Sequence, residues 1–293
     1  MKKTKIKLDF IGIGAQRSGT TWLYEMLKQH PQINFGRKKE IEFFNDKASS
    51  YVKKIDKNYQ KGLKWYKKQL DPKEDKISGE ISNNYMFDPV CAERIHKDFP
   101  DVKIIAVLRD PVERAYSQYK FANQKIHIAD SFEDALEIYD EFVERGMYYK
   151  QLKRYYDNFP KKNIFVILLD EIKDNPEGVL KGVEFFLGVR TFIPTKIREI
   201  VNPTIVAKSR KISKTLSKVQ NIKSTRFGRL LWRCKITRWM IDIVGRQVIS
   251  ANSREGKIEM MKYYTKIMLR SRLKGDIDKL EKLIGKDLSR WKR

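Results

Sequence analysis

Short apolar runs alternate with amphipathic segments along the chain up to Val189. Five runs are apolar or β-branched and end at turn residues, which predicts buried strands at residues 8–13, 33–35, 76–79, 102–108 and 163–169. Apolar residues recur at helical spacing elsewhere, which predicts helices at residues 20–29, 89–98, 112–123, 131–144, 147–158 and 176–187. Such alternation is typical of an α/β fold with a mostly parallel central sheet flanked by helices.

The pattern changes after Val201. Residues 227–244 carry apolar side chains at helical spacing with arginines between them, which predicts an amphipathic helix. Such a helix packs on a core or lies at a membrane interface; the spacing favours the core and leaves the interface open. Residues 275–291 predict a closing helix. We therefore expect a single domain over residues 1–293, with an α/β core in residues 1–200 and a helical basic extension in residues 201–293.

The chain is strongly basic. Its 62 Lys and Arg against 37 Asp and Glu give a formal net charge of +25, and residues 200–241 hold eleven of the basic residues and no acid. The excess indicates an anionic partner such as an acidic glycan, a membrane surface or nucleic acid. A lysine-rich surface without a dedicated partner explains the charge equally well, so composition alone does not choose between them.

Other features of the composition exclude several classes of protein. Two cysteines and three scattered histidines argue against a disulfide scaffold and against a metal centre. No apolar run approaches the roughly 20 residues of a membrane span, and the apolar run near the start is too short for a secretory leader. We expect a cytoplasmic protein, with peripheral membrane contact through residues 227–244 left open.

A glycine-rich turn joins the first strand to the first helix. Gly14 and Gly19 are separated by four residues, and the helix opens with Thr20 and Thr21. Glycines let the backbone approach phosphate oxygens, and a helix N-terminus supplies unpaired N–H groups, so this layout predicts an anion cradle. The Walker motif requires a lysine where Thr20 stands, and the cation of this loop is Arg17. The loop therefore favours a phospho-anion other than ATP or GTP.

A second anion-binding signal follows the strand at 102–108. Arg109 comes at the carboxyl end of that strand, and Ser117 lies two turns into the next helix. Ligands of open parallel sheets bind beyond the carboxyl ends of the strands, so Arg109 is expected to face the same cleft as the glycine-rich loop. An arginine and a hydroxyl can hold a second phosphate through charge-assisted hydrogen bonds.

Together the two stretches resemble the 5′-phosphosulfate loop and the 3′-phosphate motif of sulfotransferases that use 3′-phosphoadenosine-5′-phosphosulfate (PAPS). The similarity is greatest to the heparan sulfate N-sulfotransferase-like and bacterial carbohydrate sulfotransferase group. It extends in family order over further segments, at residues 37–46, 61–66, 79–85, 145–149, 169–172, 185–189 and 287–291. The resemblance implies a P-loop-like core and PAPS as sulfuryl donor, with no metal.

The resemblance also assigns roles to particular residues. Glu40, just before the Phe43-Phe44 pair, matches the general base, and Glu42 is its rival. Arg17 would stabilise the leaving phosphate. The remaining donor-binding residues fall into three groups: the 5′-phosphate cradle of Ser18, Gly19, Thr20, Thr21 and Trp22; Arg109 and Ser117 for the 3′-phosphate; and Lys208 and Arg210 in a loop over the nucleotide. Simple helix capping is the competing explanation for the two threonines.

The expected reaction moves a sulfuryl group from PAPS to a hydroxyl or amine of a carbohydrate or glycolipid. The basic charge of the chain leaves an acidic acceptor open. Two alternatives stay open. One is a nucleotide kinase or NTPase on a P-loop core, against which the missing Walker lysine speaks. The other is a non-enzymatic basic protein that binds membranes or nucleic acid, although base-stacking motifs are absent and no nucleic acid is expected.

Overall fold

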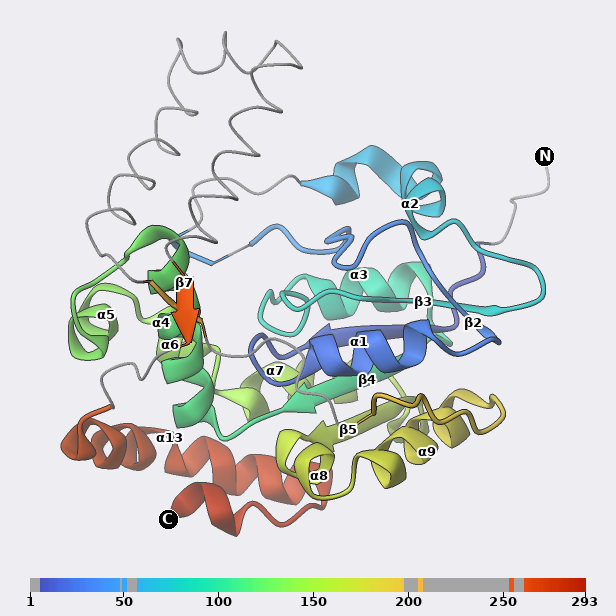
Figure 1. Cartoon of the computed structure of the whole chain (residues 1–293). Helices are drawn as coiled ribbons and strands as arrows, with labels where there is room; N and C mark the ends of the chain where they lie inside the picture. The colour runs from blue at the N-terminus through green and yellow to red at the C-terminus, as the bar shows by residue number, and fades with distance from the viewer. Residues whose placement is uncertain (1–5, 48, 52–56, 198–204, 208–252, 256–260) are drawn as a thin grey trace, which may run out of the picture. The chain divides into compact units, whose positions relative to one another are not determined.

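A computed structural model describes residues 6–47, 49–51, 57–197, 205–207, 253–255 and 261–293 (Figure 1). The chain divides into two units, one of Met1–Ala115, Glu141–Val201 and Ile267–Arg293, the other of Tyr116–Asp140 and Asn202–Lys266. The predicted single-domain organisation stays a prediction. The predicted helix over residues 227–244 lies outside the described residues, as does most of the basic stretch.

The first unit contains a five-stranded sheet. Its strands are β1 (Phe10–Gly14), β2 (Ile33–Phe35), β3 (Ile77–Ile81), β4 (Lys103–Leu108) and β5 (Ile164–Leu168). They pair in the order β2-β3-β1-β4-β5, and every pair is parallel. Strands buried on both faces are nearly continuous in apolar residues, which is why the short apolar runs marked them. The predicted α/β fold is confirmed.

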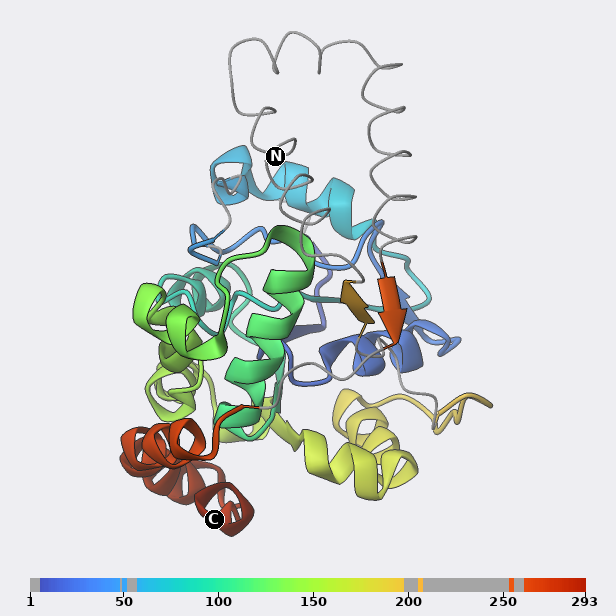
Figure 2. The same cartoon turned by 60° about the vertical axis from the view of Figure 1, so that its left-hand side comes forward.

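Helices cover both faces of this sheet. They are α1 (Thr20–Lys28), α2 (Gly62–Leu70), α3 (Cys91–Asp98), α6 (Glu141–Glu144), α7 (Tyr148–Asn158), α8 (Leu169–Asp174) and α9 (Pro176–Leu187). Side chains of α1, α8 and α9 form one core with the strands, including Leu27, Ile105 and Val183. Figures 1 and 2 show α1 and α9 on one face and α3 on the other. Right-handed crossovers place α1 and α3 on opposite faces, because the connections from β1 to β2 and from β3 to β4 run in opposite directions along the sheet.

The division of the chain into units falls within two helices. Helix α4 (Pro111–Ile126) begins in the first unit directly after β4, and α13 (Tyr263–Ile284) ends in it. The second unit contains α5 (Phe132–Ile138) and the antiparallel pair β6 (Ile205–Ala207) and β7 (Ser253–Glu255). No helix within the described ranges is long and apolar enough to cross a membrane.

Several predicted boundaries were wrong. The helix expected at 131–144 is divided into α5 and α6, because Tyr139 is in an extended conformation between them. The closing helix begins earlier than residue 275 and stops at Ile284, followed by Gly285 in the left-handed region at φ +67°. Helix α2 was not predicted, since its lysine-rich segment buries only Tyr66 and Leu70. These errors reflect weak apolar stripes and unrecognised helix ends.

Candidate functional site

The glycine-rich loop lies at the carboxyl edge of the sheet, directly after β1. Gly14 has φ +132° and Gly19 has φ +102°, and a Cβ at either position would lie 2.8 Å from another atom, the Asn83 carbonyl oxygen and a Leu169 methyl carbon respectively. The backbone amide of Ala15 donates to the Val107 carbonyl oxygen of β4 at 2.7 Å. The loop is therefore fixed between β3 and β4 in a form that glycine alone adopts at two points.

Helix α1 begins without a capping side chain. Its N-cap is Gly19, and no side chain described in the structure caps this end. The Thr20 hydroxyl instead donates to Asn83 Oδ1 at 2.7 Å, and the Thr21 hydroxyl accepts a hydrogen bond from Lys39 Nζ at 2.7 Å. The capping explanation for the two threonines is therefore wrong. The first amides of α1 face a terminus where an anion is stabilised by N–H groups and by the helix dipole.

Arg17 and Arg109 come together at this edge. Arg109 follows β4, and its guanidinium donates to the Arg17 carbonyl oxygen at 3.5 Å. Burial lowers the pKa of the Arg17 guanidinium, and the positive charge of Arg109 lowers it further. Arg17 is also held at φ +67°, in the left-handed region that non-glycine residues rarely occupy. Two cations whose charges interact attract an anion more strongly than either would alone.

Glu40 lies at the same edge, on the segment after β2. Its amide donates to the Ile81 carbonyl oxygen at 3.1 Å, and its carboxylate accepts from Asn83 Nδ2 at 2.5 Å. Because the other end of the Asn83 amide accepts from Thr20, a single side chain links the carboxylate to the start of α1. The Glu40 side chain is 39% exposed, so a reacting group can approach it from solvent.

Glu42 lies two residues further along and is bound by a different asparagine. Its carboxylate accepts from Asn84 Nδ2 at 2.6 Å, and Asn84 Oδ1 accepts from the buried Arg145 at 3.1 Å. Burial raises the pKa of Glu42, and the Asn84 hydrogen bond opposes that rise. Both glutamates are in the left-handed region, with φ +60° at Glu40 and φ +52° at Glu42. Non-glycine residues held there mark segments whose conformation the surrounding structure imposes.

A buried carboxylate that was not predicted from the sequence holds the segment of residues 40–44 in place. Glu80 of β3 accepts from the Tyr66 hydroxyl at 2.7 Å, the Ser82 hydroxyl at 2.9 Å and the Tyr85 hydroxyl at 3.0 Å. Ser82 in turn accepts from the Glu42 amide at 3.1 Å, and Tyr85 accepts from the Phe43 amide at 2.8 Å. Complete burial raises the pKa of Glu80 to about 7.

The Glu80 carboxylate and its hydroxyl partners position the backbone of residues 42 and 43 next to the candidate base. A glutamate inside an apolar strand was the available signal, because a carboxylate is rarely buried without hydrogen-bond partners. Phe43 and Phe44, expected in the core, are fully buried there. The segment is thus anchored by two aromatic rings and by hydroxyl groups that lead back to one carboxylate.

The remaining predicted residues are Ser18, Trp22, Ser117, Lys208 and Arg210. Ser18 is fully buried in the loop. Trp22 is only 7% exposed and its indole donates to the Ile197 carbonyl oxygen at 2.9 Å, so the indole N–H is already used within the protein. Ser117 is buried on α4 in the second unit. Lys208 and Arg210 lie outside the described residues.

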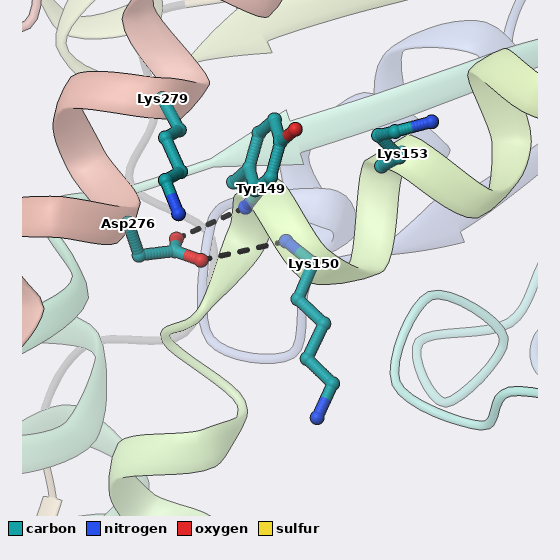
Figure 3. A pocket seen from close by; sticks show the side chains of 5 residues that line it. All are labelled: Tyr149, Lys150, Lys153, Asp276 and Lys279. Atoms are coloured by element: carbon teal, nitrogen blue, oxygen red, sulfur yellow. Dashed lines mark hydrogen bonds between the residues drawn. The ribbon is translucent and has the colours of Figure 1, made fainter.

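An open hollow of about 430 Å³ lies elsewhere in the first unit (Figure 3). Its lining comes from α7 and α13: Tyr149, Lys150, Lys153, Asp276 and Lys279. The Asp276 carboxylate accepts from the amides of Tyr149 at 3.0 Å and Lys150 at 3.4 Å, which caps α7. Figure 3 shows the Lys150 and Lys153 side chains directed away from that carboxylate. None of the predicted site residues lines this hollow.

Comparison with known proteins identifies the family of this chain. The sulfotransferase domain model matches residues 7–255. A membrane-associated sulfotransferase of Dictyostelium discoideum, kil1, is 40% identical over 120 residues, 40% of this chain and 23% of that protein. Mouse heparan sulfate glucosamine 3-O-sulfotransferase 3A1 is 30% identical over 195 residues, 63% of this chain and 46% of that protein. The chain thus spans less than half the length of these relatives.

Among solved structures, a sulfotransferase from Alicyclobacillus acidocaldarius matches over 98% of this chain and 99% of that chain, with a TM-score of 0.66 and 24% identity. This likeness supports the fold, including the parallel sheet and the closing helix. The domain match covers well over half of the chain and includes β1 to β5. The chain belongs to the sulfotransferase domain family.

Proposed function

We propose that this protein moves a sulfuryl group from PAPS to a hydroxyl or amine of a carbohydrate or glycolipid. One observation carries the proposal: Arg17 and Arg109 come together beside the uncapped start of α1, and Asn83 links Glu40 to the same helix start. Cations and free amides suit an anionic donor, and an accessible carboxylate suits proton removal from an acceptor.

The residues present fit such a donor. Gly14 and Gly19 leave no room for a side chain, so the loop backbone itself forms the surface of the cradle. The amides of Ser18 to Trp22 and the Thr21 hydroxyl would hold the 5′-phosphate, and Arg109 with Ser117 would hold the 3′-phosphate. Lys208 and Arg210 are proposed to cover the nucleotide. PAPS, when bound, supplies the sulfuryl group and a phosphate leaving group.

The side chains divide the chemistry between them. Glu40 accepts the proton of the acceptor hydroxyl or amine, and Asn83 holds its carboxylate in place. Arg17 stabilises the charge that develops on the leaving phosphate; it does so by charge and hydrogen bonds, since a guanidinium does not give up its proton near neutral pH. Positioning and charge stabilisation are what an in-line transfer of this kind requires.

The acceptor class rests on the relatives and on charge. The mouse relative is named for heparan sulfate, an acceptor carbohydrate. A net charge of +25 favours acidic glycans, because it raises their local concentration at the protein surface. We propose a cytoplasmic location; cell fractionation would check it and would also decide whether the protein contacts a membrane.

The donor class is tested by a thermal-shift comparison of adenosine 3′,5′-bisphosphate with ATP and Mg²⁺. We expect stabilisation by the bisphosphate alone, by about 2.7 kcal/mol at a ligand concentration 100 times its dissociation constant. Stabilisation by ATP and Mg²⁺ alone would indicate a kinase or NTPase. Stabilisation by neither, with salt-sensitive binding to DNA or anionic vesicles, would indicate a non-enzymatic basic protein.

The acceptor is then sought with ³⁵S-labelled PAPS. A panel of heparan sulfate oligosaccharides with free, acetylated or sulfated amines separates N-transfer from O-transfer, and glycolipids are assayed beside it. We expect label on at least one carbohydrate. Label on none of the panel, with donor binding intact, would remove the carbohydrate assignment and leave the donor class standing.

A further inference from the structure

Lys39 lies between the start of α1 and the proposed base, although sequence reasoning gave it no role. Its ammonium donates to the Thr21 hydroxyl at 2.7 Å and lies 3.8 Å from the Glu40 carboxylate. The side chain is 21% exposed, and its nitrogen lies 5.8 Å from the centre of the Tyr24 ring. The lysine is therefore held at the carboxyl edge of the sheet by groups on α1 and on its own segment.

The hydroxyl that Lys39 contacts differs from its neighbour in one respect. Thr20 uses its proton in the hydrogen bond to Asn83. Thr21 accepts from Lys39, so its own O–H stays able to donate to a ligand oxygen. An ammonium has three donors, and one of them is used on Thr21. The Lys39 ammonium and the Thr21 hydroxyl are thus arranged to bind the same anion.

Charges of both signs act on Lys39. Burial lowers the pKa of the Lys39 ammonium; the Glu40 and Glu25 carboxylates oppose this, and the Arg17 guanidinium adds to it. Arg17 in turn is affected by Arg109. Arg17 thus interacts with Arg109 and with Lys39 at this edge. A cluster of like charges in partly buried surroundings is unfavourable in the free protein and is relieved when an anion binds.

We propose that Lys39 binds the 5′-phosphosulfate end of the donor, together with the Thr21 hydroxyl. This rests on the proposed use of PAPS. In the family resemblance, the loop position of Arg17 is a lysine in many carbohydrate sulfotransferases. Here Lys39 brings a compact ammonium to the same edge from another segment, beside the planar guanidinium of Arg17. The Lys39 ammonium and the N–H groups of the Arg17 guanidinium would bind different oxygens of one anion.

The test uses isothermal titration of the full chain with three nucleotides: adenosine 3′,5′-bisphosphate, adenosine 5′-monophosphate and adenosine 3′-monophosphate. For Lys39→Met we expect affinity for the first two to fall by about tenfold, the loss of one charged hydrogen bond. Affinity for the 3′-monophosphate stays within about twofold, because no 5′-phosphate is present to lose a contact.

The matched control is Lys38→Met. Lys38 is the exposed neighbour, and its replacement removes the same positive charge. The variant therefore shows how much affinity is lost through the reduced overall charge alone. We expect all three affinities to stay within about twofold. Lys39→Arg keeps the charge without the compact ammonium and should recover part of the lost 5′-phosphate affinity.

Two results would overturn the role of Lys39. If Lys39→Met binds the bisphosphate as well as the wild type does, Lys39 makes no donor contact. If it weakens all three nucleotides by one factor and also lowers the melting temperature, Lys39 only braces α1. Failure of the wild type to bind any of the three is a different result, because it removes the donor class itself.

Discussion

The two sides of the candidate site are built in different ways. The donor side consists of loop backbone, the start of α1 and the cations Arg17 and Arg109, all within a few residues of β1 or β4. The acceptor side consists of Glu40 and Glu42, each held by an asparagine more than 40 residues away. Beneath them the Glu80 carboxylate anchors the segment through Ser82 and Tyr85.

The difference lies in what fixes each side. On the donor side, glycines and helix geometry set the backbone locally, so the ligand would meet N–H groups that need no other support. On the acceptor side, left-handed residues and buried hydroxyls keep carboxylates in place through tertiary contacts. Substitutions on the donor side should therefore change binding and charge, and those on the acceptor side should change geometry and proton affinity.

The largest effect is expected from Arg17→Gly. Glycine adopts φ +67° without strain, so the loop keeps its shape and only the charge is lost. We expect turnover to fall by about a thousandfold, roughly 4 kcal/mol of transition-state stabilisation. ³⁵S transfer measures it, with circular dichroism to check the fold. Turnover within tenfold of wild type would show that Arg17 does not neutralise the leaving phosphate.

The next largest effect is expected for Glu80→Gln, in the pH dependence of the free energy of unfolding. Burial raises the pKa of Glu80 from 4.5 to about 7, so the folded protein keeps a proton that the unfolded chain releases. That stabilisation is fully present below pH 4.5 and is lost as pH rises through 7, a fall of about 3 kcal/mol in the free energy of unfolding. The amide of the variant does not titrate, so this fall should vanish.

Urea unfolding at pH 5, 6, 7 and 8 provides the measurement for both proteins. The free energy of unfolding of the wild type should fall relative to that of Glu80→Gln at each step upward in pH. Parallel curves would mean that Glu80 titrates alike in the folded and unfolded chains. Its place as the buried anchor of the acceptor side would then need another explanation.

Glu40→Gln is expected to lower turnover by about a hundredfold, near 2.7 kcal/mol. Donor affinity should be unchanged, because Glu40 is proposed to act on the acceptor. Glu42→Gln is the matched comparison, since it removes the neighbouring carboxylate. A larger loss of turnover in Glu42→Gln than in Glu40→Gln would transfer the role of base to Glu42.

The smallest effects are expected from the two asparagines. Asn83→Ala removes the hydrogen bond to Glu40, and Asn84→Ala removes the one to Glu42. We expect turnover to fall about tenfold in Asn83→Ala, roughly 1.4 kcal/mol, and less in Asn84→Ala. Donor affinity, followed by titration with the bisphosphate, separates positioning of the base from damage to the cradle. Equal losses in both variants would contradict a distinct role for Asn83.

Much of the fold was predictable because its signals are local. The runs that became β1, β4 and β5 are short and apolar, and Gly188 ends α9 in the left-handed conformation that favours glycine. Boundaries were less predictable where the apolar stripe is weak, as in α2, or where one residue breaks a helix, as Tyr139 does. There, tertiary packing outweighs local preference.

The donor side was predictable for the same reason. Glycine spacing, the loop arginine and Arg109 at a strand end are readable in the linear chain, and the parallel sheet then brings the strand ends to one edge. Lys39 and Asn83 were not predictable, since nothing nearby in the chain distinguishes them from other polar residues, and the place of Glu80 in β3 signalled burial but not its partners. Their contacts to Thr21, Glu40 and Tyr85 exist only once β1, β3 and the segment after β2 lie side by side.

By itself, then, the amino-acid order determined the class of fold, the glycine-rich loop after β1 and the family to which the chain belongs. Only the tertiary structure decided which hydroxyl retains a free proton, which glutamate is accessible, and which lysine joins the arginines. The physical reason is range: backbone preferences act over a few residues, whereas hydrogen bonds and charges act between any groups that folding brings within a few ångströms.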